Sequence, residues 1–254
     1  MGEVDNINSH IQMPKCVFKE FAKDNNGFYK YNIQSGVINR GFPKSTFTEE
    51  GYYSDTMEKM LNRFVETPLK KLLDFARELP TKSLPIVLDS EIKEIALVFV
   101  KSLIARSPTL YSAVQKNSFF FQFASKQNQH DIIVNYAMRE KKMEELFSKF
   151  DLSFMINETK IPFVLPTRGI YEYRINGILC MNVPLTPNCA IFFKEKGKAI
   201  HKSNDGETEI TILPEEFDDV AMKINSYALQ RQIQDKIGYI VCHKKEVLNF
   251  LVQS

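Results

Sequence analysis

The sequence predicts an α+β fold: an N-terminal hairpin, a helical middle, and a mainly antiparallel C-terminal sheet with a closing helix and strand. Apolar residues recur with helical spacing up to about residue 150, and short β-branched and aromatic runs follow. Segregated helices and strands are typical of α+β folds rather than of βαβ winding. The chain has 254 residues and shows no interdomain linker, so we expect a single domain, 1–254. Its helix-rich part, 1–150, and its sheet-rich part, 151–254, are expected to share one core.

The first element with a clear pattern is a β-hairpin. Residues 1–13 are polar, and we expect poor order at the start of this segment. Residues 28–33 and 37–42 alternate between apolar and polar side chains on either side of a turn that contains Gly36. Alternation around a glycine turn predicts two antiparallel strands.

The first long helix is predicted over residues 55–79, where apolar side chains follow three-to-four spacing. Asp55 and Glu58 resemble a capping box at its start. Pro68 interrupts the pattern and predicts a kink or break near Thr67, because proline disfavours the helical conformation of the residue before it.

A second helix is predicted over residues 89–107, capped by Asp89 or Ser90 and stopped or restarted at Pro108. A third covers residues 125–150, and its charged stretch 139–142 is interpreted as a solvated face. The phenylalanines at 119–121 and 123 are expected in the core.

Short strands are predicted after Phe150, with the hairpin signal Asn176-Gly177 among them. Pro214 is expected at the first position of a last helix. Residues 237–243 are predicted as a strand and 247–252 as an apolar tail. The predicted strands before that helix are residues 152–156, 162–165, 170–175, 178–183, 190–193 and 207–213.

Net charge, cysteine spacing and the length of apolar stretches limit which partners and which cellular compartment we expect. The formal net charge is +2, from 33 basic and 31 acidic residues, which gives no strong field for nucleic acid or an anionic membrane. The four cysteines have no C-x-x-C spacing, so we expect reduced thiols in a cytoplasmic protein. No apolar stretch approaches the ~20 residues that span a bilayer, so no membrane association is expected.

The sequence offers few residues in patterns that carry chemistry. The histidines lack ligand spacing, and adjacent Cys242 and His243 would point to opposite faces of a strand, so no metal site is expected. Glycine-rich phosphate loops are absent, and we expect no cofactor. Cys16 is interpreted as an inert thiol, although a pairing with a distant histidine stays open. Glu158, between two predicted strands, is the most notable single acid.

Several blocks resemble a bacterial family, domain of unknown function 4238. The blocks are Pro14-Lys15-Cys16-Val17-Phe18-Lys19-Glu20-Phe21, Leu103-Ile104-Ala105-Arg106-Ser107-Pro108, residues 163–170 and Pro184-Leu185-Thr186-Pro187. Members typically begin H-Y-V-P-Q-F-Y-L-K-x-F and carry an S-D-N-P turn. Here Ile11 replaces the family histidine, with His10 one place earlier, and the turn is Pro166-Thr167-Arg168-Gly169. The chain thus resembles a divergent member that lacks most polar motif residues, and the resemblance implies no catalytic residue.

Three functional hypotheses follow. The first is a non-catalytic interaction or regulatory protein with a protein partner, which we favour over an enzyme. The second is an enzyme acting on nucleic acid or nucleotides, possibly in bacterial conflict or phage defence, with candidate residues His10, Arg106, Glu158 and Arg168. The third is a nucleic-acid binder, in which the aromatic and basic residues of the hairpin at 29–31 and 40 stack on bases.

Overall fold

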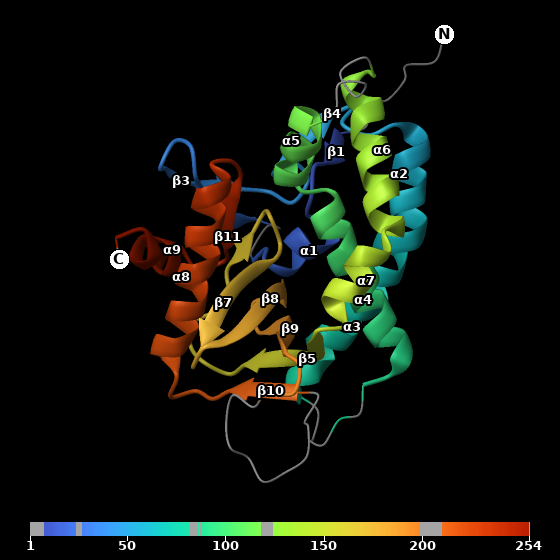
Figure 1. Cartoon of the computed structure of the whole chain (residues 1–254). Helices are drawn as coiled ribbons and strands as arrows, with labels where there is room; N and C mark the ends of the chain where they lie inside the picture. The colour runs from blue at the N-terminus through green and yellow to red at the C-terminus, as the bar shows by residue number, and fades with distance from the viewer. Residues whose placement is uncertain are drawn as a thin grey trace.

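A computed structural model describes residues 8–23, 27–81, 86, 88–117, 124–198 and 210–253. It confirms the α+β class (Figure 1). The helices are α1 (Lys15–Glu20), α2 (Asp55–Leu61), α3 (Thr67–Glu78), α4 (Ser90–Ala105), α5 (Pro108–Asn117), α6 (Lys126–Arg139), α7 (Lys141–Phe147), α8 (Asp218–Asp235) and α9 (Lys245–Gln253), with a π-helical segment η2 (Asn62–Glu66) and a 3₁₀ turn η3 (Leu79–Thr81). The strands are β1 (Asn8–His10), β2 (Phe28–Asn32), β3 (Ile38–Gly41), β4 (Thr48–Glu50), β5 (Phe150–Asn157), β6 (Leu165–Pro166), β7 (Tyr171–Ile175), β8 (Ile178–Thr186), β9 (Cys189–Glu195), β10 (Ile210–Leu213) and β11 (Tyr239–Cys242).

The central sheet has the order β10-β5-β9-β8-β7 and is buried on both faces. Successive side chains of a strand point to opposite faces, so each strand supplies two separate clusters. Ile191 and Phe193 of β9 join the cluster that contains α3 and α4, whereas Phe192 joins the cluster that contains α8 and α9. In Figure 1 the sheet accordingly lies between α8 on one side and the helices α3, α4 and α7 on the other.

The predicted hairpin is present and belongs to a second sheet, of order β3-β2-β11-β6. Its turn carries Gly36 at φ +69°, a conformation that glycine adopts without strain. The strand expected at 237–243 is confirmed as β11, which pairs antiparallel with both β2 and β6. The N-terminal part of the fold is therefore joined to its C-terminal part by main-chain hydrogen bonds.

The kink or break expected near Thr67 is found as a change of helix type, because Glu66 and Thr67 keep helical backbone angles. The π-helical segment η2 lies between α2 and α3, and the Thr67 N–H donates to the carbonyl of Asn62. Pro68 follows within the first turn of α3, where its missing N–H costs least. The cap of α2 is Ser54 rather than Asp55, because the Ser54 hydroxyl accepts from the Met57 N–H.

The segment 8–13 forms structure that the sequence did not predict, because residues 8–10 form β1 against β4, and Gln12 and Met13 are buried. Residues 1–7, where poor order was expected, lie outside the described residues. Two local predictions were wrong. The single helix over 125–150 is two helices, because the backbone of Glu140 is extended. The last long helix, α8, begins at Asp218 after a turn at Pro214, and the apolar tail is the helix α9.

One group of predicted core residues, the phenylalanines at 119–121 and 123, lies outside the described residues. Within the described ranges, the structure contains no helix that is both long and apolar enough to cross a membrane.

Candidate functional site

His10 and Arg106, two of the four candidate residues, lie in one polar cluster at the end of α4. The Gln12 side chain donates to the Leu103 carbonyl at 2.7 Å, and this bond holds the N-terminal segment against α4. His10 is half-buried, and burial together with the Arg106 and Lys15 charges lowers its pKa to about 4. His10 is therefore a neutral imidazole at pH 7 and lies within the field of the Arg106 guanidinium.

Arg106 is an interior cation with few partners. Its side chain is 1% exposed, and its Nη1 lies 3.9 Å from Oε1 of Glu66. Nη2 donates to the Ser102 hydroxyl at 3.5 Å, and Nε has no hydrogen-bond partner. Buried guanidinium groups are usually held by several short charge-assisted hydrogen bonds, so this one is under-satisfied.

Cys16 belongs to the same neighbourhood but is not an activated nucleophile. Burial, followed by the Glu66 charge, raises the pKa of its thiol to about 11. A thiol with that pKa carries almost no thiolate at neutral pH, which agrees with the interpretation of Cys16 as inert. All four cysteines are free, and the described residues contain no group of three or more metal-ligating side chains.

Arg168 is held in a structural turn by hydrogen bonds from its backbone and its side chain. Its Nη1 donates to both carboxylate oxygens of Asp235, at 2.8 and 2.9 Å, and its Nε donates to the Ile170 carbonyl. Its backbone N–H donates to Oε1 of Gln232 at 3.0 Å. The Thr109 hydroxyl also donates to Asp235, so the turn before β7 is tied to the end of α8 and the start of α5.

Glu158 lies at the opposite end of α8 from Arg168. Its N–H donates to the Leu213 carbonyl, and its side chain is exposed. Two residues later the Lys160 N–H donates to Asp218 at the start of α8, whereas Arg168 pairs with Asp235 at the end of that helix. Because α8 has 18 residues, its ends lie about 27 Å apart. The structure thus brings His10 and Arg106 together but leaves Glu158 far from Arg168.

The aromatic and basic side chains of the hairpin contact one another or the sheet. The Arg40 guanidinium lies 5.5 Å from the centre of the Tyr29 ring, and the Lys30 ammonium lies 4.4 Å from that of Tyr239. These cation–π contacts use the ring faces on which a base would stack.

An apolar groove with an acidic border lies between the start of α8 and α9. It measures about 400 Å³ and is lined by Ile161, Asp218, Asp219, Met222, Glu246, Val247 and Phe250. Phe250 is 57% exposed, and the carboxylates of Asp219 and Glu246 belong to exposed residues. Large apolar side chains with charged neighbours are typical of surfaces that bind proteins.

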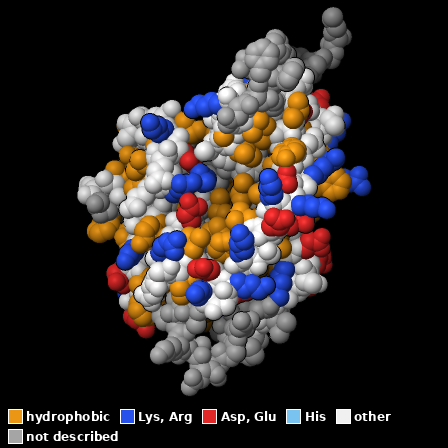
Figure 2. Space-filling model, in the orientation of Figure 1, with side chains coloured by type: hydrophobic (Ala, Val, Ile, Leu, Met, Phe, Trp, Pro, Cys, Tyr) orange, Lys and Arg blue, Asp and Glu red, His pale blue; other side chains and the backbone are white. Residues whose placement is uncertain are grey.

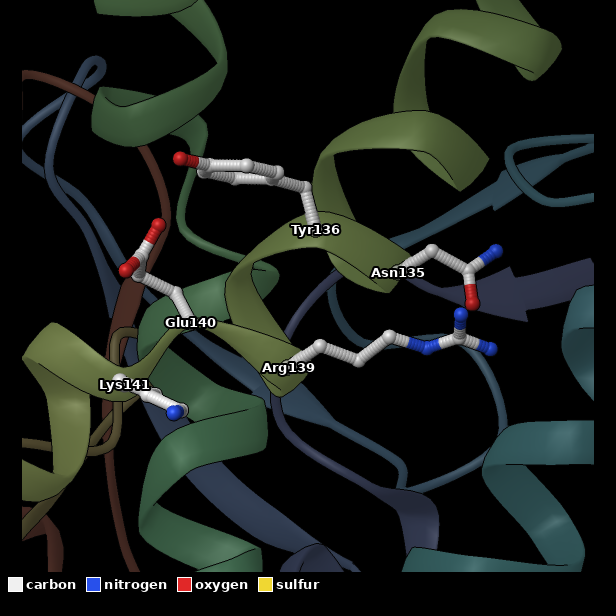
Figure 3. A pocket seen from close by; sticks show the side chains of 5 residues that line it. All are labelled: Asn135, Tyr136, Arg139, Glu140 and Lys141. Atoms are coloured by element: carbon white, nitrogen blue, oxygen red, sulfur yellow. The ribbon is translucent and has the colours of Figure 1, made fainter.

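A second open pocket, of about 380 Å³, lies where α6 ends and α7 begins (Figure 3). Tyr136 and Glu140 turn toward one another on one side, Asn135 and Arg139 do so on the other, and Lys141 points away from both pairs. The hydrogen bond from Tyr136 raises its own pKa and lowers that of Glu140. The side chains that line this pocket are therefore largely occupied with each other.

Charges of both signs are mixed on the face shown in Figure 2, and hydrophobic side chains gather in the hollow at its centre. This pattern agrees with the net charge of +2. It lacks the single-sign field expected of a surface that follows a phosphate backbone.

Sequence reasoning missed Phe250 and Glu66. Phe250 was assigned to an apolar tail without helical structure, whereas the helical spacing of α9 places Val247 and Leu251 in the core and turns Phe250 outward. Glu66 gave no signal, because its proximity to Arg106 depends on how η2 packs against α4.

The family comparison agrees with the resemblance in the sequence. The sequence model of the family described as "Protein of unknown function (DUF4238)" matches residues 12–163. That range includes α1, the hairpin, the helical middle and β5. No curated protein and no solved structure gives a significant match.

Proposed function

This chain belongs to the DUF4238 family, a family of unknown function, and we propose that it is a non-catalytic interaction protein whose α8–α9 groove binds a basic, apolar segment of a partner protein. The observation that carries the proposal is the combination of Phe250, 57% exposed, with three carboxylates along the same groove.

The groove offers an apolar anchor. Met222, Val247 and Phe250 contribute side chains from two helices, so an apolar side chain of a partner would contact both helices at once. Completing the burial of Phe250 would contribute about 1–2 kcal/mol, since full burial of a phenylalanine is worth about 1.5–3 kcal/mol.

The charges of the groove select the partner. Asp218 accepts from the Lys160 N–H, which leaves the exposed Asp219 and Glu246 to face the solvent side of the groove. Lysine or arginine side chains flanking the apolar anchor would pair with these two carboxylates. Such rim pairs contribute mainly to association rate and specificity, and they weaken as salt is added.

A peptide library displayed on phage and selected on the purified full chain tests this function. We expect enrichment of sequences with lysine or arginine beside a large apolar residue. Phe250→Ala should lower the affinity for a selected peptide about 5- to 30-fold, which corresponds to the loss of about 1–2 kcal/mol of binding free energy. Asp219→Lys should also lower the peptide affinity at low salt, and it should have little effect on that affinity at high salt.

Phe64→Ala is the matched control. Phe64 is 56% exposed and also borders an apolar groove, of about 120 Å³, between η2 and α4. Peptide affinity should not change in this variant. Enrichment of acidic peptides, no enrichment at all, or equal losses at Phe64 and Phe250 would contradict the proposal.

The two alternatives stay open as proposals. Nucleic-acid binding would show affinity that falls steeply with salt. An enzyme acting on nucleic acid or nucleotides would show turnover of RNA, DNA or nucleotides with the purified chain, with or without Mg²⁺.

A further inference from the structure

We infer that the cluster of Arg106 and His10 is a binding site for a small phosphate-type anion, independent of the α8–α9 groove. The first basis is the unfilled hydrogen-bonding capacity of Arg106. Its Nε is buried without a partner, and its two recorded contacts, at 3.5 and 3.9 Å, are long for a charged donor. A buried guanidinium in this state costs free energy that a bound anion would recover.

The second basis is His10, which has an unfilled acceptor. Its Nδ1 is buried and has no hydrogen-bond partner. The ring also has a hydrogen bond to the backbone of Thr46, which favours the tautomer that leaves Nδ1 as an acceptor. The Arg106 donor and the His10 acceptor therefore occur in the same cluster, and each lacks a partner of its own.

The surroundings hold His10 in place. The Tyr53 hydroxyl donates to the Ile11 carbonyl at 2.8 Å, directly after His10 in the chain. The His10 ring lies 5.8 Å from the ring of Phe18, between centroids. His10 is half-buried whereas Arg106 is interior, so the cluster extends inward from the surface.

The charges that act on His10 itself are positive and come from Arg106 and Lys15. Carboxylates are also close to Arg106: Glu66 lies 3.9 Å from its Nη1, and Glu58 and Asp131 act together with Arg106 on Tyr53. None of them gives Nε of Arg106 a hydrogen-bond partner.

The donor and acceptor together define the ligand. A phosphate monoanion, or a protonated phosphate monoester, carries ionised oxygens that accept from Arg106 and a P–O–H group that donates to Nδ1 of His10. Sulfate has a similar shape and charge but no hydroxyl at neutral pH. Inorganic phosphate keeps a P–O–H group both as the monoanion and as the dianion, so it is expected to bind more tightly than sulfate. A phosphate monoester loses its only P–O–H group above its second pKa, about 6, so its binding should weaken as the pH rises through that value.

The test is a titration of the full chain with inorganic phosphate, sulfate and a nucleoside monophosphate, followed by calorimetry and by thermal unfolding. We expect saturable binding of phosphate with a preference over sulfate. The nucleoside monophosphate should also bind if the natural ligand is a monoester, whereas a preference for inorganic phosphate identifies the free ion.

Three variants locate the site. Arg106→Lys keeps the charge but loses the Nε donor, and His10→Phe keeps a ring next to Phe18 but loses the acceptor. Each should weaken phosphate binding about 10- to 100-fold, the size expected for one charge-assisted hydrogen bond. Arg77→Met is the control, because Arg77 is an exposed arginine already paired with Glu20 and Asp74.

If Arg106→Lys fails to fold, His10→Phe and the ¹⁵N shifts of the His10 ring in the unaltered protein decide the question. Phosphate should move the Nδ1 resonance. Absence of saturable phosphate binding, equal affinity for sulfate, or binding that survives His10→Phe unchanged would overturn the inference.

Discussion

Gly238→Ala is expected to destabilise the protein much more than Gly177→Ala, although the two glycines have nearly the same backbone conformation. Their φ angles are +87° and +81°, so alanine is strained at both positions. At Gly177 an added Cβ meets no atom within 4 Å, whereas at Gly238 it would lie 2.2 Å from Oγ1 of Thr167 and 3.0 Å from Nε2 of Gln232.

The magnitude follows from what Thr167 does. Its hydroxyl accepts from the Tyr239 N–H at 3.0 Å, and its side chain is buried, so moving it breaks a hydrogen bond in the interior. Left-handed strain costs about 1–2 kcal/mol for either alanine. Overpacking adds about 1–3 kcal/mol at Gly238, and the lost hydrogen bond adds about 1 kcal/mol. We therefore expect losses of about 1–2 kcal/mol at Gly177 and about 3–6 kcal/mol at Gly238.

Urea titration and thermal unfolding followed by circular dichroism measure both variants. For a chain of this size, about 1 kcal/mol corresponds to about 2–4 °C in Tm. Gly177→Ala should therefore lower Tm by a few degrees, and Gly238→Ala by about 6 °C or more. Equal losses in the two variants would refute the close approach of Gly238 to Thr167.

Three further outcomes are expected. Asn225→Ala should cost about 2–4 kcal/mol in urea titrations, because it removes two buried hydrogen bonds to backbone groups at Pro162 and Val164; a loss below 1 kcal/mol would contradict those bonds. The folded pKa of His10 is lowered to about 4, so the unfolded chain binds the proton first and stability falls as pH drops below about 6.5. The contribution of His10 to the loss by pH 5 is about 2 kcal/mol. His10→Gln should remove this contribution and leave that of His130, whose pKa burial also lowers to about 4; an unchanged pH slope would argue against the buried neutral ring. Asp235→Asn should cost about 2 kcal/mol at low salt by leaving the partly buried Arg168 without its carboxylate, and a wild-type Tm would show that this pair contributes nothing.

Local chemistry explains which elements could be predicted from the sequence. Asn176 and Gly177 both adopt positive φ, as the turn between β7 and β8 requires, and these two residues alone predict the turn. Asp89 caps α4 with its own side chain, which accepts from the Glu91 N–H two residues later. These signals act within a few residues, so no knowledge of the fold is needed to find them.

Other elements depend on partners far away in the chain. β1 has only three residues and becomes a strand because β4 pairs with it. β10 pairs parallel with β5, and no turn residues in the sequence predict this pairing. The split between α6 and α7 is missed because Glu140 is a good helix former whose backbone is nonetheless extended, and its carboxylate caps α7.

The candidate site could be predicted only in part from the sequence, for the same reason. His10 and Arg106 were named from the sequence as single residues, but their proximity depends on the bond between Gln12 and the end of α4. Arg168 was named from the sequence as a candidate residue of an enzyme acting on nucleic acid or nucleotides, and it lies in the turn Pro166-Thr167-Arg168-Gly169. In the structure Asp235, from a helix much later in the chain, is its partner.

The central sheet separates two hydrophobic clusters, and this separation has a consequence for the buried cysteines. Cys189 belongs to the interior on the α3–α4 side of the central sheet, whereas Cys180 and Cys242 belong to the interior beside α8. Thiol reagents attack only an exposed, ionised sulfur, and burial raises the pKa of all three thiols. The rate at which each cysteine is alkylated, measured by mass spectrometry, would therefore show when the packing around it opens. Equal rates for Cys189 and for Cys180 and Cys242 would indicate that both sides of the central sheet open in one step, and different rates that they open in succession.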